Sequence, residues 1–491
     1  MNHLVPAEVK KVTKALREAG FEAYLVGGCV RDLMLEKKPK DWDITTNAHP
    51  AQIQQVFPES FYENEYGTVG VKTGSEDESI AIVEVTPYRS ESGYSDRRRP
   101  DTVTFGVSLE EDLARRDFTI NALAYDESKG HLKDALIDPF GGLKDIQDRV
   151  LRAVGNPLER FNEDALRMVR AVRLIAELSF AIDAETASAI SECGDNLSHV
   201  SRERIRDELV RILLSREPMT ALALAERLNI LKHIAPDLLR GIGVEQNQAH
   251  SFTVFEHNLR TMQHAADKNW HFDVRLAGLF HDISKPETRR WSDEKKDWTF
   301  HGHDVVGARV TKKALENLKF SRETVEKVSK LVRWHMFFSD PDVITLSAVR
   351  RIIRNVGEEH IWDLLNLRVC DRIGTGRPKE QPFRLRKYIS MVEQALRDPI
   401  SVALLKTDGT RIMELFHEKP GPKIGWTLNA LLEEVLEDPN LNTKEYLDER
   451  TQKLLNMPAD KLKVLGESGK KKREEKEDAE IQKIMEKHHV C

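Results

Sequence analysis

The pattern of apolar and polar positions changes character at about Ser108 in this chain of 491 residues. Before that point, short apolar runs are interrupted by turn residues, as in FEAYLV before Gly27 and Gly28, in DWDITT and in IAIVEVTPYR. Short runs with a period of two, bounded by glycine, are typical of strands. Residues 6–19 instead show helical spacing that ends before Gly20. The first part of the chain is therefore predicted to mix strands and helices.

Beyond Ser108 the spacing of apolar residues is helical almost to the end of the chain. LEEDLARRDFTINAL and EDALRMVRAVRLIAEL both have this spacing, whereas the polar stretch ESGYSDRRRPD just before them predicts a mobile loop. The final segment, GKKKREEKEDAEIQKIMEKHHV, is poor in apolar residues and dense in charge, which is typical of a solvated helix or a disordered tail. We therefore expect an α+β fold, with a mixed sheet and helices in the head and helices alone thereafter.

Composition narrows the classes of protein. Hydrophobic residues make up 40% of the chain, which is enough to build cores, and the net charge of -6 means that nucleic-acid contact must come from local basic patches. Cys29, Cys193, Cys370 and Cys491 are widely spaced and form no CxxC pair, which argues against a zinc ribbon and fits a reducing cytoplasm. No apolar run reaches the roughly 20 residues that span a bilayer. MNHLVPAEVKK also lacks the apolar core of a signal peptide. We expect a cytoplasmic protein without a membrane segment.

Two aspartates in the head suggest metal chemistry. Asp41 and Asp43 form DWD, and alternate residues of a strand face the same side. Carboxylates at this spacing suit Mg²⁺, and two such ions stabilise both the attacking and the leaving oxygen of a phosphoryl transfer. Glu84, in the alternating run IVEV, is the expected third carboxylate. Taken alone, a DxD pair also describes two solvated acids on an edge strand.

The glycine turn that precedes DWD favours a metal site over two solvated acids. Gly27 and Gly28 stand before a predicted helix, with Arg31 in its first turn. Glycines let backbone amides approach phosphate oxygens, a helix N-terminus favours anions, and arginine adds a forked cationic contact. A triphosphate site beside a metal site is the interpretation that accounts for both features.

Four motifs in order carry a resemblance to a known family: GGCVRD (27–32), DWD (41–43), RRDFTINA (115–122) and EDALR (163–167). This set resembles the class II tRNA nucleotidyltransferase and bacterial poly(A) polymerase family, within the polymerase-beta-like nucleotidyltransferases. The resemblance implies template-independent transfer of CMP and AMP from CTP and ATP to tRNA, with Mg²⁺ in the head. It assigns the metals to Asp41 and Asp43, and nucleotide contacts to Gly27, Gly28, Arg31, Arg115, Arg116, Asp117, Asn121, Asp164 and Arg167.

The chemistry of Asp164 and Arg167 supports a base-reading role independently. Three residues apart, they are expected to share a helix face. Aspartate only accepts hydrogen bonds and arginine only donates them. Adenine and cytosine both present an amino donor beside a ring-nitrogen acceptor, so such a pair accepts ATP and CTP and rejects GTP and UTP. The alternative is an exposed ion pair of little consequence. Arginines that follow are expected to contact RNA phosphates in part: Arg170, Arg173, Arg202, Arg204, Arg206 and Arg211.

A second metal site is predicted in the middle of the chain. Its residues follow the order H…HD…H…H…D, which resembles the HD phosphohydrolase superfamily, and Lys285 extends the motif to HDxxK. Imidazole and carboxylate ligands suit Mn, Fe, Ni, Co or Zn, and such a mixed set also holds Mg; the site would activate water against a phosphoester. A degenerate scaffold that only supports RNA is the alternative. The predicted ligands are His257, His281, Asp282, His303, His335 and Asp371, with His264, His301 and His360 as bystanders and His301 a rival of His303.

These observations favour addition of C, C and A to the 3′ end of tRNA. The alternatives are a poly(A) polymerase, an enzyme that adds only CC or only A, and an HD phosphohydrolase whose head positions RNA. The oligomeric state and the identity of the HD metal stay open. The expected parts are a head at 1–150, a base-reading and RNA-binding neck at 151–240, an HD domain at 241–375, a helical tRNA-contact region at 376–465 and a charged tail at 466–491.

Overall fold

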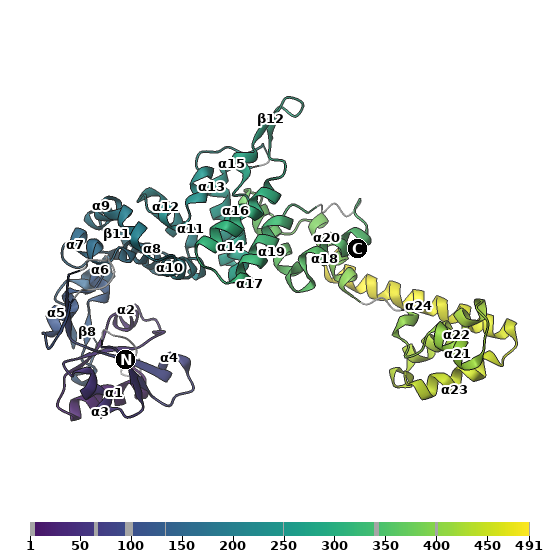
Figure 1. Ribbon diagram of the computed structural model, residues 1–491, viewed down its shortest axis with the longest axis horizontal. Coiled ribbons are helices and arrows are strands. Elements are labelled where there is room, and N and C mark those ends of the chain that lie inside the picture. The colour runs from purple at the N-terminus through teal and green to yellow at the C-terminus, as the bar shows by residue number, and fades with distance from the viewer. Residues whose placement is uncertain are drawn as a thin grey trace. The chain divides into compact units, whose positions relative to one another are not determined.

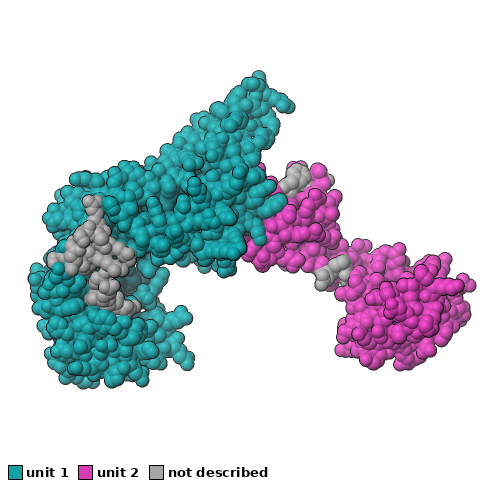
Figure 2. Space-filling view, in the orientation of Figure 1, with its two compact units in different colours: residues 1–335, 366–378 teal, residues 336–365, 379–491 magenta. Residues whose placement is uncertain are grey.

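The computed structural model describes residues 5–62, 67–93, 102–132, 134–248, 250–337, 343–397 and 401–490. The chain forms two compact units, which Figure 2 distinguishes by colour. Unit 1 comprises Met1–His335 and Asn366–Pro378, and unit 2 comprises Met336–Leu365 and Lys379–Cys491. In the described ranges, no helix is long and apolar enough to cross a membrane. The predicted loop ESGYSDRRRPD lies outside the described residues from position 94 onward.

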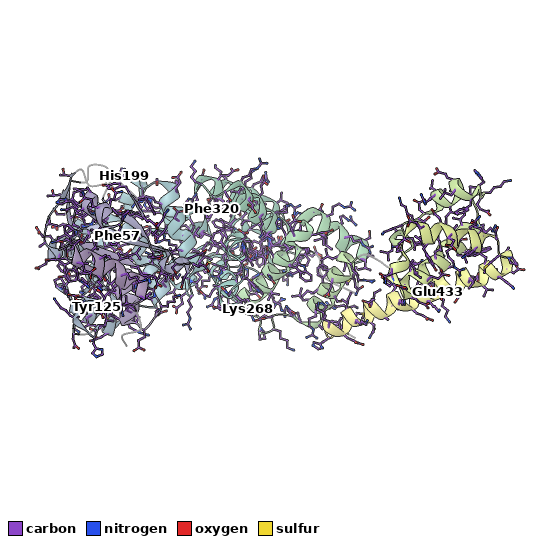
Figure 3. All side chains as sticks on the ribbon, turned by 90° about the horizontal axis from the view of Figure 1, so that it is seen from below. Phe57, Tyr125, His199, Lys268, Phe320 and Glu433 are labelled. Carbon is purple, nitrogen blue, oxygen red and sulfur yellow. The ribbon has the colours of Figure 1, made fainter. Side chains whose placement is uncertain are left out.

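The head of unit 1 is built on a mixed sheet. Tyr125, which is labelled in Figure 3, lies on one of its strands. The strand order is β3-β4-β5-β2-β1-β8-β9, with β2 and β5 parallel and the other neighbouring pairs antiparallel. A helical remainder follows, so the expected α+β fold is confirmed. The strands are β1 Ala23–Val26, β2 Asp43–Thr46, β3 Ser60–Tyr62, β4 Val69–Lys72, β5 Ile82–Pro87, β8 Ala124–Tyr125 and β9 Leu136–Ile137.

Helices of the head connect and cover these strands. The first, α1, ends at Glu18, and Gly20 follows with a φ of 88°, as the sequence predicts. The helix expected over LEEDLARRDFTINAL is shorter than predicted, because Asp117 accepts a hydrogen bond from the amide of Phe118 at 2.9 Å and Phe118 is extended. The head helices are α1 Ala7–Glu18, α2 Gly28–Met34, α3 Pro50–Val56, α4 Glu78–Ala81, α5 Leu109–Ala114 and α6 Gly142–Asp148, with the short hairpin β6 Arg89–Ser92 and β7 Thr102–Phe105 before α5.

The rest of unit 1 is helical apart from short strand pairs. Helix α14 is buried along nearly its whole length, which explains its run of apolar residues, and the hairpin β12–β13 projects beyond α15 in Figure 1. The helices are α7 Pro157–Glu163, α8 Leu166–Leu178, α9 Ala184–Cys193, α10 Arg202–Leu214, α11 Pro218–Arg227, α12 Leu231–Ile234, α13 Val254–Asp267, α14 Phe272–Phe280, α15 Lys285–Thr288, α16 His303–Asn317, α17 Arg322–Trp334 and the part of α19 Ile361–Gly374 that begins at Asn366. The short pairs are β10 Val150–Leu151 with β11 Ala181–Ile182, and β12 Arg290–Ser292 with β13 Asp297–Thr299.

Unit 2 contains the charged C-terminal segment, which is helical, the first of the two alternatives expected for it. Residues 466–487 continue a helix that begins at Ala459, and two glycines in it allow close packing on α22. A Cβ on Gly466 would lie 2.5 Å from Cα of Trp426, and one on Gly469 would lie 2.5 Å from the carbonyl oxygen of Asn429. One face of the segment is therefore packed rather than solvated. The helices of unit 2 are α18 Leu346–Val356, α20 Phe383–Leu396, α21 Gly409–Phe416, α22 Pro422–Glu437, α23 Lys444–Leu455 and α24 Ala459–Lys487.

Candidate functional site

The head carboxylates lie at the start of β2. Asp43, the first residue of β2, is in register with Glu84 of the parallel strand β5. The amide of Glu84 donates to the carbonyl oxygen of Trp42 at 3.1 Å. Trp42 is only 1% exposed, whereas Asp41 is exposed and Asp43 is half-buried. Alternation along the chain thus places Trp42 in the core and both aspartates away from it. Asp41 itself precedes the strand, which is shorter than the sequence suggests.

The turn after β1 approaches these carboxylates closely. Gly27 has a φ of 78°, and a Cβ on it would lie 2.9 Å from Nη1 of Arg116 and 3.6 Å from Oδ2 of Asp43. A residue with a side chain is strained at this φ and would also press on the arginine. The glycine turn, one predicted metal ligand and one predicted phosphate ligand therefore meet at one place in the head.

A buried aspartate that the sequence analysis did not identify holds both arginines of RRDFTINA. Asp112 has no exposed surface and receives a hydrogen bond from Nη2 of Arg115 at 2.7 Å, with Nη2 of Arg116 at 3.5 Å. Burial raises the pKa of Asp112, but the charges of Arg115 and Arg116 outweigh it and hold that pKa below its usual value. Thr45 on β2 also donates to Asp112, at 3.2 Å. The spacing of three and four residues on α5 was the available signal.

Three predicted nucleotide-binding residues form one hydrogen-bonded chain with a neck arginine. Arg31 donates to Oδ1 of Asn121 at 2.8 Å, and Asn121 donates to Oδ1 of Asp117 at 3.1 Å. Arg170 donates to Oδ2 of Asp117 at 2.9 Å. Burial raises the pKa of Asp117, but Arg170 and the bond from Asn121 together lower it below its usual range. Asp117 is thus an ionised anchor between the head and helix α8.

The expected helix face shared by Asp164 and Arg167 is not present. Asp164 is extended, with φ -136° and ψ 103°, and separates α7 from α8 because its carboxylate accepts a hydrogen bond from the amide of Leu166 at 3.0 Å. It pairs with Arg204 of α10 at 2.8 Å. Arg167 pairs instead with Glu163 at 2.5 Å. The two residues are near in sequence, but they are oriented by different partners.

Most of the neck arginines have partners within the protein. Arg173 donates to Glu208 at 2.6 Å, and Arg202 donates to the carbonyl oxygen of His233 at 2.9 Å. Arg206 donates to Asp207 at 2.8 Å, whereas Arg211 is exposed. Internal pairing therefore accounts for much of this arginine content, and RNA contact by these residues stays a prediction.

The six histidines and aspartates of the HD pattern come together in unit 1. Two groups of possible ligand atoms, each within 4.8 Å of one another, are His257, His281 and Asp371, and Asp282, His303 and His335. The helices explain this meeting: His257 is on α13, His281 and Asp282 follow the buried helix α14, His303 begins α16, His335 caps α17 and Asp371 is on α19. His301, the rival of His303, is exposed.

Asp282 lies between the two groups. Its Oδ2 is 3.1 Å from Nε2 of His257 and 3.3 Å from Nε2 of His281, and its Oδ1 is 3.2 Å from Nε2 of His303 and 3.5 Å from Nε2 of His335. One carboxylate thus presents one oxygen to each pair of imidazoles. Together these nitrogen and oxygen donors would suit a divalent cation.

Backbone carbonyls orient three of these rings. Nδ1 of His281 is 2.9 Å from the carbonyl oxygen of Gly278. The same spacing of three residues recurs at 2.6 Å in His303 with Phe300 and in His335 with Val332. A carbonyl only accepts, so each Nδ1 carries a proton and each Nε2 faces the centre, where it would be the ligand atom of a bound metal. The residues present therefore fit a divalent transition metal or Mg²⁺.

His250 joins this cluster although it lies outside the HD pattern. Its ligand atom groups with those of His257 and Asp282 within 4.8 Å. Burial, followed by the charge of Lys285, lowers the pKa of His250 to about 3, so its ring is neutral. No motif in the sequence distinguishes His250 from the other histidines among the 17 of the chain. It reaches the site through the path of the short segment before α13, which the sequence pattern did not predict.

Models of known domain families match most of unit 1. The Poly A polymerase head domain matches residues 23–152, the probable RNA and SrmB-binding site of polymerase A matches 179–241, and the HD domain matches 254–373. The CCA-adding enzyme of Lactobacillus helveticus is 32% identical over 451 residues, which cover 90% of this chain and 96% of that enzyme. The CCA-adding enzyme of Lactobacillus delbrueckii subsp. bulgaricus is 48% identical over 211 residues, and there the chain spans about half (51%) of the relative's length.

Solved structures share the fold. The Bacillus stearothermophilus CCA-adding enzyme in complex with CTP matches 91% of this chain and 99% of its own, with 26% identity and a TM-score of 0.58. The Thermotoga maritima CCA-adding enzyme, solved in complex with tRNA, matches 92% of this chain and 97% of its own, with 19% identity and a TM-score of 0.51.

Proposed function

Since this chain belongs to the family of CCA-adding enzymes, we propose that it adds CMP, CMP and AMP in turn to the 3′ end of tRNA, using CTP and ATP. In each step the 3′-hydroxyl oxygen attacks the α-phosphorus, a phosphodiester forms, the hydroxyl proton is lost and diphosphate leaves. The observation that carries the proposal is the meeting of Gly27, Asp43 and Arg116, with Glu84 in register on the next strand. Binding of RNA alone requires no such carboxylates.

The head residues have separate tasks in this reaction. Mg²⁺ held by Asp41, Asp43 and Glu84 would stabilise charge on the attacking and leaving oxygens. Gly27 leaves room for the triphosphate, whose charge Arg116 neutralises. These carboxylates supply the oxygen ligands that Mg²⁺ prefers, and their register on adjacent strands fits a shared site.

The remaining nucleotide contacts follow from the hydrogen-bonded chain. Arg31 and Gly28 would contact the phosphates, and Asp117 and Asn121 would contact the ribose, where a bond to the 2′-hydroxyl excludes deoxynucleotides. Arg115 donates to Asp112, to Glu91 and to the carbonyl oxygen of Arg89, so we assign it to holding α5 against β6 and not to a nucleotide contact. We propose that Asp164, in the break between α7 and α8, and Arg167, on α8, still read the base, with Arg204 orienting the carboxylate of Asp164.

Three RNAs distinguish full CCA addition from its alternatives. The assay offers tRNA lacking CCA, tRNA ending in CC and an unstructured RNA, each with one labelled nucleotide at a time. CTP should label only the first and ATP should label the second, whereas the unstructured RNA should take up neither. Labelling of the unstructured RNA by ATP would favour a poly(A) polymerase, and loss of either specific step would favour a partial enzyme. We also propose a cytoplasmic location, which the wide spacing of the four cysteines and the lack of a CxxC pair support.

A second activity is favoured by the position of Asp282 between two histidine pairs. We propose that the HD cluster holds divalent cations and hydrolyses 2′,3′-cyclic phosphates or small phosphoesters. Bound metal would lower the pKa of water; the oxygen of water joins phosphorus and one ester P–O bond breaks. A metal screen on model phosphodiesters tests this in the wild type and in a variant that combines His281→Ala with Asp282→Ala.

The matched control is His301→Ala, which changes an exposed histidine beside the cluster. Hydrolysis should be lost only in the double variant, and nucleotide addition should persist because the head has its own carboxylates. No hydrolysis above the double variant with any metal would reject this activity. Loss of addition in a folded double variant would instead mean that the HD region positions tRNA.

A further inference from the structure

Lys285 of the HDxxK sequence is buried beside the histidine cluster. It is only 5% exposed, and its ammonium lies 2.5 Å from Oδ2 of Asp282. A lysine has three donors and a strongly hydrated charge, so burial is costly unless each donor has a partner. The two other groups near this ammonium come from outside the HD pattern.

The segment that precedes α13 supplies these two groups. Lys285 donates to Oε1 of Gln246 at 2.6 Å, and its Nζ is 3.4 Å from Nε2 of His250. Nδ1 of His250 lies 2.7 Å from Oδ1 of Asn247, so Nδ1 carries the proton and Nε2 accepts from Lys285. Gln246 is fixed in turn, because its amide donates to the carbonyl oxygen of Phe252 at 3.1 Å.

We propose that His250 and Gln246 are positioning residues that aim Lys285 at the anionic oxygens of a phosphoester bound at the HD cluster. This inference rests on the proposed hydrolytic function and adds the group that would recognise the charge of the substrate. Gln246 and His250 accept from two of the three donors of the ammonium and so fix its direction. The third donor meets Oδ2 of Asp282, and it would be released to an anionic oxygen when that carboxylate holds a metal. A fixed cation binds an anion more strongly than a mobile one. His250 acts through Lys285, not as a metal ligand.

Binding of inorganic phosphate to the metal-loaded full chain, measured by calorimetry, tests this proposal without requiring turnover. Lys285→Met should weaken phosphate binding by about tenfold or more, and His250→Leu by a smaller factor. Combining both should weaken it no more than Lys285→Met alone, because the histidine acts through the lysine. His250→Gln, which keeps an acceptor, should restore most of the affinity. Metal content should be the same in all five proteins.

Three outcomes would overturn the proposal. Additive losses in the double variant would mean that His250 acts independently of Lys285, and a lower metal content in His250→Leu would make His250 a ligand. Absence of phosphate binding by the metal-loaded wild type would also overturn it. If the predicted binding pattern is found but no phosphoester is hydrolysed, the anion site stands and the proposed hydrolysis fails.

Discussion

Asp43 at the start of β2 lies in register with Glu84 on the neighbouring parallel strand β5. This pairing brings carboxylates from two parts of the head to one place, beside the turn at Gly27. Because both side chains point away from the core, substituting either carboxylate should affect activity more than the stability of the sheet.

Asp43→Asn and Asp41→Asn should each reduce nucleotide addition by about 10³-fold or more, which corresponds to roughly 4 kcal/mol of transition-state stabilisation. The physical reason is loss of charge at the proposed metal site with little change in side-chain volume. Single-turnover incorporation of CMP measures the effect, and circular dichroism reports folding. Asp148→Asn, at an exposed ion pair with Lys144, is the matched control. Wild-type rates in a folded Asp43→Asn protein would contradict the assignment.

Gly27→Ala should raise the KM for CTP and ATP by about tenfold or more, since its Cβ would press on Arg116. Gly74→Ala is the control, because Gly74 also has a positive φ, of 76°, but has nothing within 4 Å of the added Cβ. Both variants should lose about 1 to 3 kcal/mol of stability through backbone strain. Steady-state kinetics and urea unfolding separate the two effects, and an equal KM change in both variants would refute the specific role of Gly27.

Asp117→Asn should destabilise the protein by about 2 kcal/mol at pH 7, because Arg170 loses its charged partner. The folded-state pKa of Asp117 is lowered, so its contribution is complete above the unfolded pKa near 4 and declines as the pH falls toward the folded pKa. Urea unfolding at pH 7 and pH 3 measures this. The difference in the free energy of unfolding between wild type and variant should be smaller at pH 3 than at pH 7. No difference at pH 7, or an equal difference at both pH values, would disprove the coupling between Asp117 and Arg170.

Combining Asp164→Asn with Arg167→Gln should lower the discrimination against UTP and GTP by about tenfold, while affinity for the triphosphate changes less. The reason is that these changes alter which atoms donate and which accept. Competition between CTP and UTP, and between ATP and GTP, measures the selectivity. Arg322→Gln, at an exposed ion pair with Glu326 on α17, provides the control. Unchanged selectivity in the double variant would exclude base reading by this pair.

Local sequence patterns predicted much of the head. The runs DWDITT and IAIVEVTPYR predicted strands β2 and β5. Burial of every second residue is found along β5, as strand geometry requires for a sheet with one buried face, whereas Ile44, Thr45 and Thr46 of β2 are all buried. The order of the HD pattern similarly named six side chains that the fold brings together. A strand is recognisable from one short run, whereas the HD pattern is recognisable from the order of its residues along the chain.

Features that depend on distant partners were not predictable in this way. The break at Asp164 arises because its side chain bonds to the next turn and to Arg204, 40 residues away. Asp112 matters because Thr45 and two arginines converge on it, and His250 because Lys285 lies beside it. The charged helix α24 packs on α22 through two glycines. The composition of this segment did not predict that contact, because it indicated only a high charge and few apolar residues.

The most direct test of the account is to sequence the 3′ ends formed on tRNA that lacks CCA when all four nucleoside triphosphates are present. If the head selects CTP and ATP without a template, the products should end in CCA and should not be extended further. UMP and GMP should be incorporated only rarely. Asp43→Asn, assayed in parallel, should leave the ends unextended. Runs of adenosine, ends that stop at CC, or no extension by the wild-type protein would contradict the proposal that this chain is a complete CCA-adding enzyme.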